Sequence, residues 1–208
     1  MKKIEYIFID MFGVIIEESK GYFIPYTYEH FDRSEYDRIT HAFRVEKLFG
    51  KAHRGEISSY DFLTALGFSD PKSTMKDYLE NYLTLDPDFS DFAEKFSGEL
   101  KFVLLSNDVS EWSRCLTEYH GLNGYFAAKY VSADIGIRKP DAAFFKYVLD
   151  DLNCDPERCL FIDNSVKNIE SAKTLGIKTV LFNRDNEEYD GLSVNSFEEL
   201  ARTIDLLT

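Results

Sequence analysis

Short apolar runs alternate with amphipathic segments along much of the chain. The clearest runs are rich in β-branched and aromatic residues and lie at residues 4–9, 101–105, 159–162 and 178–182, with a weaker one at 129–131. Continuous apolar runs of this length predict strands that are buried on both faces. The first and third runs end directly at an aspartate, and the second ends at Ser106.

Three segments between these runs have apolar residues at helical spacing, namely residues 109–119, 141–152 and 165–175. Pro140 precedes the second segment, which suits the first turn of a helix. Gly176 follows the third segment, where glycine commonly ends a helix. Strands that alternate with helices predict parallel βαβ units, and therefore an α/β fold with a doubly wound parallel sheet.

The alternation is interrupted between residues 17 and 87, where no strand pattern occurs. Residues 56–66 and 73–83 each predict an amphipathic helix. We therefore expect an all-helical insertion, or cap domain, at residues 17–87. The α/β core domain would then comprise residues 1–16 and 88–208.

Composition restricts the partners of the protein. The 208 residues have a formal net charge of −13, and an acidic surface repels nucleic acids and anionic membranes. We therefore expect neither as a partner, and any phosphate site must be locally positive. The three cysteines and the absence of a secretory signal or membrane-spanning run favour a reduced, cytoplasmic protein. The sequence gives no indication of an oligomeric state.

Polar side chains follow the predicted strands at their carboxyl ends, where open parallel sheets bind ligands. These residues are Asp10, Ser106, Asn107, Asp163 and Asn164. The basic pair Arg138-Lys139 precedes Pro140 at a predicted helix start. Two carboxylates, a hydroxyl and a lysine at one edge of a sheet would suit a hard cation together with a phosphate.

Four segments resemble, in order, the four motifs of the haloacid dehalogenase superfamily. They are FIDMFGVII, LLSN, the lysine of GIRKPD, and FIDNSVKNIESAKTLGI. The resemblance covers residues 4–16 and 100–182 and is closest to the subgroup with a helical cap after the first motif. It implies a Rossmann-like core and a magnesium-dependent phosphatase that acts on a small phosphorylated metabolite.

The resemblance also implies a role for each motif residue. Asp10 would be the nucleophile that forms an aspartyl-phosphate, a known role for a carboxylate. The Ser106 hydroxyl and the Asn107 backbone N–H would bind the phosphate. Lys139 would place a positive charge beside the transferring oxygens.

A magnesium site is implied at the same place. Asp10, Asp163 and the backbone carbonyl of Phe12 would bind Mg²⁺, and Asn164 would hold a metal-bound water. Two carboxylates are sufficient because Mg²⁺ retains several waters in proteins.

Phe12 departs from the pattern of the family's phosphatases, which have a second aspartate at this position. That aspartate protonates the leaving oxygen and later activates water, and a positioned acid–base group contributes about 10²–10⁴ in rate. Hydrolysis should therefore be slow unless another group substitutes. Three readings remain open: a phosphatase with a substitute group or an easy leaving group, a non-catalytic phosphate- or partner-binding protein, and a dehalogenase-type hydrolase. Dehalogenases need no metal and lack a metal-binding pair in the fourth motif. The presence of Asp163 therefore argues against the third interpretation.

The remaining candidates have structural roles. We expect Arg138 to be peripheral, Asn168 to support the loop that carries Asp163, and Trp112 to pack in the core or between domains. The four histidines are assigned no chemistry. The aromatic residues of the insertion would either line a substrate pocket or pack the cap's own core: Tyr22, Phe23, Tyr26, Tyr28 and Phe31.

Overall fold

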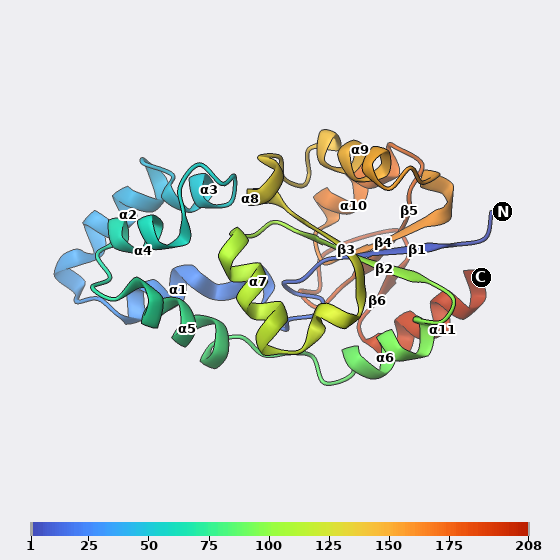
Figure 1. Ribbon diagram of the computed structural model, residues 1–208, viewed down its shortest axis with the longest axis horizontal. Coiled ribbons are helices and arrows are strands. Elements are labelled where there is room, and N and C mark those ends of the chain that lie inside the picture. The colour runs from blue at the N-terminus through green and yellow to red at the C-terminus, as the bar shows by residue number, and fades with distance from the viewer. Residues whose placement is uncertain (1, 208) are drawn as a thin grey trace.

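The fold is a parallel sheet flanked by helices, with a group of further helices beyond one end of the sheet (Figure 1). The structure is a computed structural model and describes residues 2–207. All strand pairs are parallel and follow the order β3-β2-β1-β4-β5-β6. The strands are β1 Tyr6–Ile9, β2 Lys101–Ser106, β3 Phe126–Val131, β4 Cys159–Asp163, β5 Lys178–Phe182 and β6 Ser193–Val194.

The sequence-based strands are confirmed, with differences at the edges of the sheet. The run at 129–131 is only the end of β3, which begins at Phe126. The two-residue strand β6 was not predicted, because a pair of residues is too short to show a pattern. The doubly wound α/β fold is confirmed.

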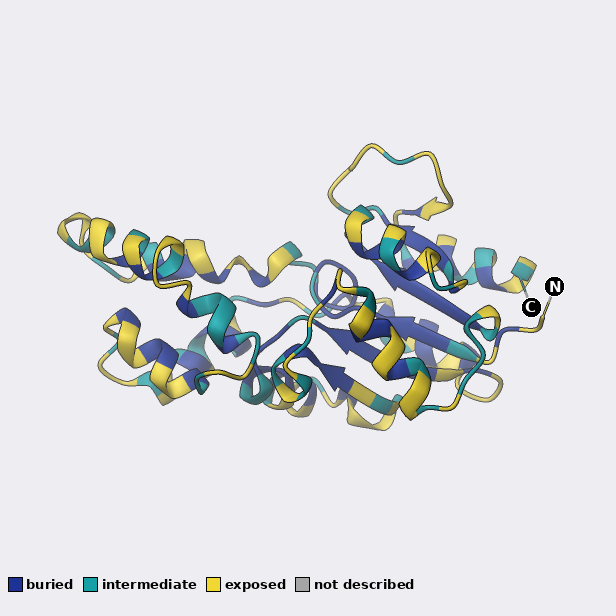
Figure 2. Ribbon diagram, turned by 90° about the horizontal axis from the view of Figure 1, so that it is seen from above, coloured by how far each residue is buried: buried dark blue, intermediate teal, exposed yellow. Residues whose placement is uncertain are grey.

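Alternate residues of the central strands face two different layers of helices. Ile7 and Ile9 pack toward α6 (Phe89–Phe96), α7 (Ser110–Tyr119) and α11 (Phe197–Leu207). Phe8 packs on the opposite face with α9 (Ala142–Asp151) and α10 (Val166–Lys173). Because both faces are covered, the strands β1, β2, β4 and β5 are almost wholly buried (Figure 2), which explains their continuous apolar runs.

The predicted helices are present, most of them with shorter bounds, whereas the helix predicted at 73–83 lies two residues earlier, at Pro71–Asn81. Asp141 is the N-cap of α9, and its side chain accepts a hydrogen bond from the Ala143 backbone N–H. The helix predicted at 56–66 begins only at Ser59, because Ser58 is its N-cap and accepts from the Asp61 N–H. No helix within residues 2–207 combines the length and apolar character needed to cross a bilayer.

The segment between β1 and β2 contains the expected helices and no named strand among its described residues. The helices are α1 Phe23–Glu29, α2 Tyr36–Arg44, α3 Leu48–Ala52, α4 Ser59–Leu66 and α5 Pro71–Asn81. Figure 1 shows them grouped beyond the end of the sheet toward which β1 runs. The exact limits of the cap at residues 17 and 87 stay a prediction.

An aromatic cluster joins the cap to the core. Trp112 on α7 is fully buried, and its ring centroid lies 4.7 Å from Phe23, 6.0 Å from Phe62 and 5.1 Å from Tyr78. These three rings belong to the cap helices, so the expectation that Trp112 packs between the two parts is confirmed. The cap and this face of the core therefore share one continuous apolar cluster.

Candidate active site

Lys139 lies between two carboxylates at the carboxyl ends of β1 and β4. Its Nζ is 2.9 Å from Asp10 Oδ1 and 2.7 Å from Asp163 Oδ2. The register explains the proximity, because Ile9 and Ile162 are paired and each precedes one of the aspartates. The order of the strands reverses at this pair of strands, which is where open α/β sheets bind ligands.

Burial determines the charges of this triad. Desolvation raises the pKa of Asp10 to about 7, although Lys139 acts in the opposite direction and the charge of Asp163 adds to the rise. Burial alone would lower the pKa of Lys139, but the charges of Asp10 and Asp163 outweigh it and raise that pKa overall. Lys139 therefore remains a cation beside Asp10 and Asp163.

The loop after β4 holds Asp163 in a fixed orientation. Its Oδ1 accepts from the Ser165 backbone N–H at 2.8 Å, and Asn168 Nδ2 donates to both carboxylate oxygens at 3.0 Å. Asn168 is one turn into α10 and buried. It therefore supports the loop, as expected from the sequence.

Asn107 connects the loop after β2 to the loop that carries Lys139. Its Nδ2 donates to the Lys139 carbonyl, and its Oδ1 accepts from the Lys139 backbone N–H, both at 2.8 Å. The preceding Ser106 is completely buried, and its Oγ has no hydrogen-bond partner. Asn107 lines the cavity between the strand-end loops and the cap, whereas Ser106 does not.

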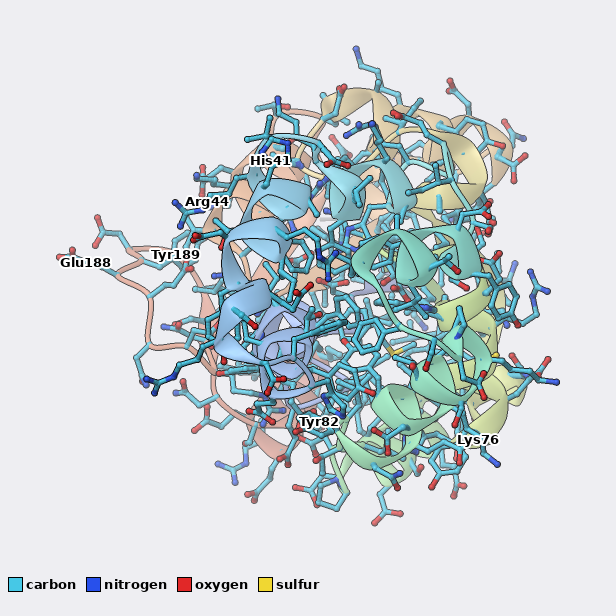
Figure 3. The ribbon with its side chains drawn as sticks, turned by 90° about the vertical axis from the view of Figure 1, so that its left-hand side faces the viewer. His41, Arg44, Lys76, Tyr82, Glu188 and Tyr189 are labelled. Carbon is cyan, nitrogen blue, oxygen red and sulfur yellow. The ribbon has the colours of Figure 1, made fainter. Side chains whose placement is uncertain are left out.

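The first loop, after β1, requires glycine. Gly13 has φ +80°, and a Cβ at this position would lie 2.1 Å from Asn164 Nδ2. That amide donates at 3.2 Å to both Ser19 Oγ and Asp185 Oδ2. Asp185 belongs to the loop after β5, whose outer part carries Glu188 and projects at the edge of the molecule (Figure 3).

A cavity of about 460 Å³ lies between these loops and the cap. Asp10, Lys139 and Asn164 line its core side. Its aromatic lining consists of Phe12, Phe49, Tyr78 and Trp112. The aromatic residues proposed from the sequence, Tyr22, Phe23, Tyr26, Tyr28 and Phe31, are not among the lining residues. Phe23 and Tyr26 are instead buried in the apolar cluster, so the packing alternative was the correct one for them.

Several polar lining residues were not identified, or were misjudged, from the sequence, among them Arg138, His53 and Asp108. Arg138, expected to be peripheral, lines the cavity, and so does His53, to which no chemistry was assigned. Burial and the charges of Arg138 and Arg54 lower the pKa of His53 to about 3, so its ring is neutral. His41, in contrast, lies on the outer surface of the cap (Figure 3). The third residue, Asp108, is buried and also lines the cavity.

The residues fit a hard cation that retains waters. No group of three or more His, Cys, Asp or Glu side chains within residues 2–207 could hold a metal ion. The site instead offers two carboxylates, Asp10 and Asp163, which is the type of ligand set that Mg²⁺ uses. Among residues 2–207, Lys139 is the lysine that forms ion pairs with both carboxylates, and burial followed by the charge of Asp163 raises the pKa of Asp10 in spite of it.

The chain is similar in sequence to several hydrolases and to a drimenol cyclase. A model of the haloacid dehalogenase-like hydrolases matches residues 4–176. A drimenol cyclase of Aspergillus calidoustus is 28% identical over 150 residues, 68% of this chain and 28% of that protein. A glyceraldehyde 3-phosphate phosphatase of Methanocaldococcus jannaschii is 28% identical over 100 residues, 45% of this chain and 43% of that protein. The chain thus spans less than half of the length of these two relatives. A D-ribitol-5-phosphate phosphatase of Bacteroides thetaiotaomicron is 27% identical over 144 residues, 64% of this chain and 69% of that protein.

Solved structures show the same fold. A haloacid dehalogenase family enzyme of Bacteroides thetaiotaomicron, in complex with magnesium and inorganic phosphate, superimposes with a TM-score of 0.72 at 22% identity. The match covers 90% of this chain and 98% of that one. The L-2-haloacid dehalogenase of Xanthobacter autotrophicus gives a TM-score of 0.67 at 18% identity, over 99% of this chain and 100% of that one.

Proposed function

Because the chain belongs to the haloacid dehalogenase-like hydrolases, we propose that it is a magnesium-dependent phosphatase that forms an aspartyl-phosphate on Asp10. The observation that carries this proposal is the buried triad of Asp10, Lys139 and Asp163 at the carboxyl ends of β1 and β4. Asp10 and Lys139 line a cavity that is bordered on its other side by Phe49, His53 and Tyr78 of the cap segment. Bound Mg²⁺ would neutralise phosphate charge and orient the phosphoryl group.

Each residue of the triad has a separate task. Asp10 attacks phosphorus, and Lys139 donates to the transferring oxygens, where phosphoryl transfer needs electrostatic stabilisation. Asp163 would hold the cation with Asp10 and the Phe12 carbonyl, and Asn164 would act through a water. Asn107 fixes the position of Lys139 through its two hydrogen bonds, and the unpartnered Ser106 hydroxyl together with the Asn107 N–H would bind the phosphate.

The proposed substrate class is a small phosphorylated metabolite. Relatives of the chain include phosphatases of glyceraldehyde 3-phosphate and D-ribitol 5-phosphate. A cavity of about 460 Å³ is at the lower end of the range for small-molecule sites. Lys20, Arg138 and Lys167 line it together with Lys139 and supply positive charge beside the carboxylates of the cavity.

Release of inorganic phosphate from a panel of phosphomonoesters and acyl phosphates, with and without Mg²⁺, tests the proposal. We expect turnover only with Mg²⁺, and its loss in Asp10→Asn. Acetyl phosphate should add one phosphoryl group to the wild type but not to Asp10→Asn, as intact-mass spectrometry would show after a rapid quench. No adduct and no turnover with any substrate would refute the enzyme. Because Phe12 replaces the usual acid–base group, that result would favour a phosphate-binding protein without activity.

A further inference from the structure

Asp108 places a carboxyl group without a full set of partners beside the active site. The residue follows Asn107, is 1% exposed and lines the same cavity as Asp10. Its Oδ1 accepts from the Val109 N–H at 2.8 Å, whereas its buried Oδ2 has no hydrogen-bond partner. A buried polar atom without a partner is costly and requires an explanation.

Asp108 shares its cavity with the ring of Phe12, which stands where the usual aspartate would be. Burial raises the pKa of the Tyr78 phenol well above its usual value, and the charge of Asp108 raises it further. A Cβ on Gly21 would lie 2.6 Å from the Tyr78 hydroxyl and 3.4 Å from the Phe12 ring. Phe12, Tyr78 and Asp108 all line the cavity that also exposes Asp10.

The other groups on this part of the cavity are poorly suited to exchanging a proton with substrate. His53, with a pKa of about 3, is uncharged at neutral pH and too weak a base to take up a proton there. The Tyr78 hydroxyl already donates to the Gly21 carbonyl, and burial keeps its pKa well above the usual value. Asp185 accepts hydrogen bonds from Ser19 and Asn164.

We propose that Asp108 is the general acid–base that replaces the carboxyl group missing at Phe12. This inference rests on the proposed phosphatase function. The Oδ1 hydrogen bond to Val109 fixes the orientation of the carboxyl group, and Oδ2 is the atom that carries and returns the proton.

The proton and the electrons balance over two half-reactions. Asp10 attacks phosphorus, the bond to the ester oxygen breaks, and that oxygen takes its electron pair and the proton of Asp108. The Asp108 carboxylate then removes a proton from a water whose oxygen attacks phosphorus. The bond between phosphorus and Asp10 breaks, inorganic phosphate leaves, and Asp108 is protonated again.

The environment of Asp108 supports the protonated starting state. Burial raises its pKa well above the usual value, against the Val109 hydrogen bond, and the charges of Asp10 and Asp134 raise it further. The nearby cations Lys139 and Arg138 line the same cavity but do not offset this rise. A raised pKa favours the protonated form, which is the form that a catalytic acid needs.

Acetyl phosphate separates the two half-reactions, because acetate leaves without a proton. The test variant is Asp108→Asn, which keeps the acceptor for the Val109 N–H. Its matched control is Glu111→Gln, which removes a carboxylate that does not line the cavity from the first turn of α7, the helix that follows Asp108. We expect Asp108→Asn to gain the phosphoryl group as fast as wild type and to release phosphate about 10²–10⁴-fold more slowly.

Three further readouts decide the assignment. Breakdown of the phospho-enzyme should accelerate with rising pH in the wild type and be independent of pH in Asp108→Asn. Adding Phe12→Asp to Asp108→Asn should recover part of the lost rate. Glu111→Gln should match wild type throughout, whereas an equal loss in both variants would indicate a structural effect and overturn the assignment.

Other outcomes refute the inference in distinguishable ways. Phosphate release by Asp108→Asn within about threefold of wild type, far below the effect of a lost acid–base group, would overturn only the role of Asp108. Loss of phosphorylation itself in Asp108→Asn would show that the residue maintains the site and is not its acid–base. If wild type neither becomes phosphorylated nor releases phosphate, the proposed function fails and this inference fails with it.

Discussion

Replacing Lys139 by methionine would leave two buried carboxylates without their cation. The lysine side chain is 0% exposed, and its ammonium contacts Asp10 at 2.9 Å and Asp163 at 2.7 Å. Removing one partner of a buried ion pair costs about 3–5 kcal/mol, because an uncompensated charge remains. Since domains are stable by about 5–15 kcal/mol, Lys139→Met should remove a large fraction of the free energy of unfolding.

An exposed pair of the same length provides the control. Lys95 lies 2.7 Å from Asp205, with side chains 48% and 52% exposed. Such surface pairs contribute about 0.2–1 kcal/mol, so Lys95→Met should be almost neutral. Urea unfolding of both variants in EDTA at about pH 8, where the ordinary carboxyl is ionised, measures the difference.

A second variant keeps the test decisive if Lys139→Met unfolds. Adding Asp163→Asn removes one of the two stranded charges and should recover part of the lost stability, because the two sites are coupled. The reasoning is refuted if Lys139→Met costs no more than about 1 kcal/mol above Lys95→Met. It is equally refuted if Asp163→Asn destabilises the Lys139→Met protein further.

Three more predictions follow from the packing and the charges. Trp112→Ala should lower the free energy of unfolding by about 3–5 kcal/mol, measured by urea unfolding, because its ring fills the cap–core cluster. Tyr119→Ala, at an exposed position, should lower it little. Equal losses in the two variants would contradict the role of the cluster. Gly13→Ala should lower the free energy of unfolding by about 1–2 kcal/mol, because residue 13 has φ +80°. It should also displace Asn164 and so weaken Mg²⁺ binding, as measured by calorimetry. Unchanged stability and unchanged Mg²⁺ affinity would contradict this prediction. Because burial raises the pKa of Asp10 from 3.8 to about 7, the metal-free protein should lose stability as pH rises from about 4 to about 7. In Asp10→Asn this loss should be smaller, and an identical pH profile would show that Asp10 is not its source.

The sequence was most informative where the fold buries a strand on both faces. Such strands show as continuous apolar runs, and all four clear runs correspond to β1, β2, β4 and β5. The edge of the sheet was harder to predict. In β3 only Tyr130 and Val131 are buried, and the exposed Lys129 separates them from the partly buried Phe126 and Ala128, so no continuous apolar run marks the whole strand. Helices α6 and α11, which cover one face, were not predicted, although their apolar residues recur at helical spacing.

Some residues of the site could be predicted from the local sequence, whereas others depend on the tertiary structure. Asp10 and Asp163 each follow a predicted strand, so the topology alone brought them to one edge of the sheet. Lys139 was assigned by motif resemblance, and the structure places it between them. Arg138 was misjudged because an exposed basic residue in a loop looks the same in sequence whether or not a cap lies above it.

Asp108 shows why a catalytic group can be absent from its usual position without being absent from the site. A proton donor needs a carboxyl group at the reacting oxygen and an environment that keeps it protonated, and neither condition refers to a particular strand. Phe12 and Asp108 lie on different loops, yet both border the cavity beside Asp10. A second aspartate at position 12 would add another carboxylate to a site whose triad contains only one lysine. An apolar ring there spares that repulsion and lowers the local dielectric, which favours the protonated form of a neighbouring acid. Phe12 therefore removes the usual acid of the family and at the same time creates conditions under which Asp108 can serve as the acid.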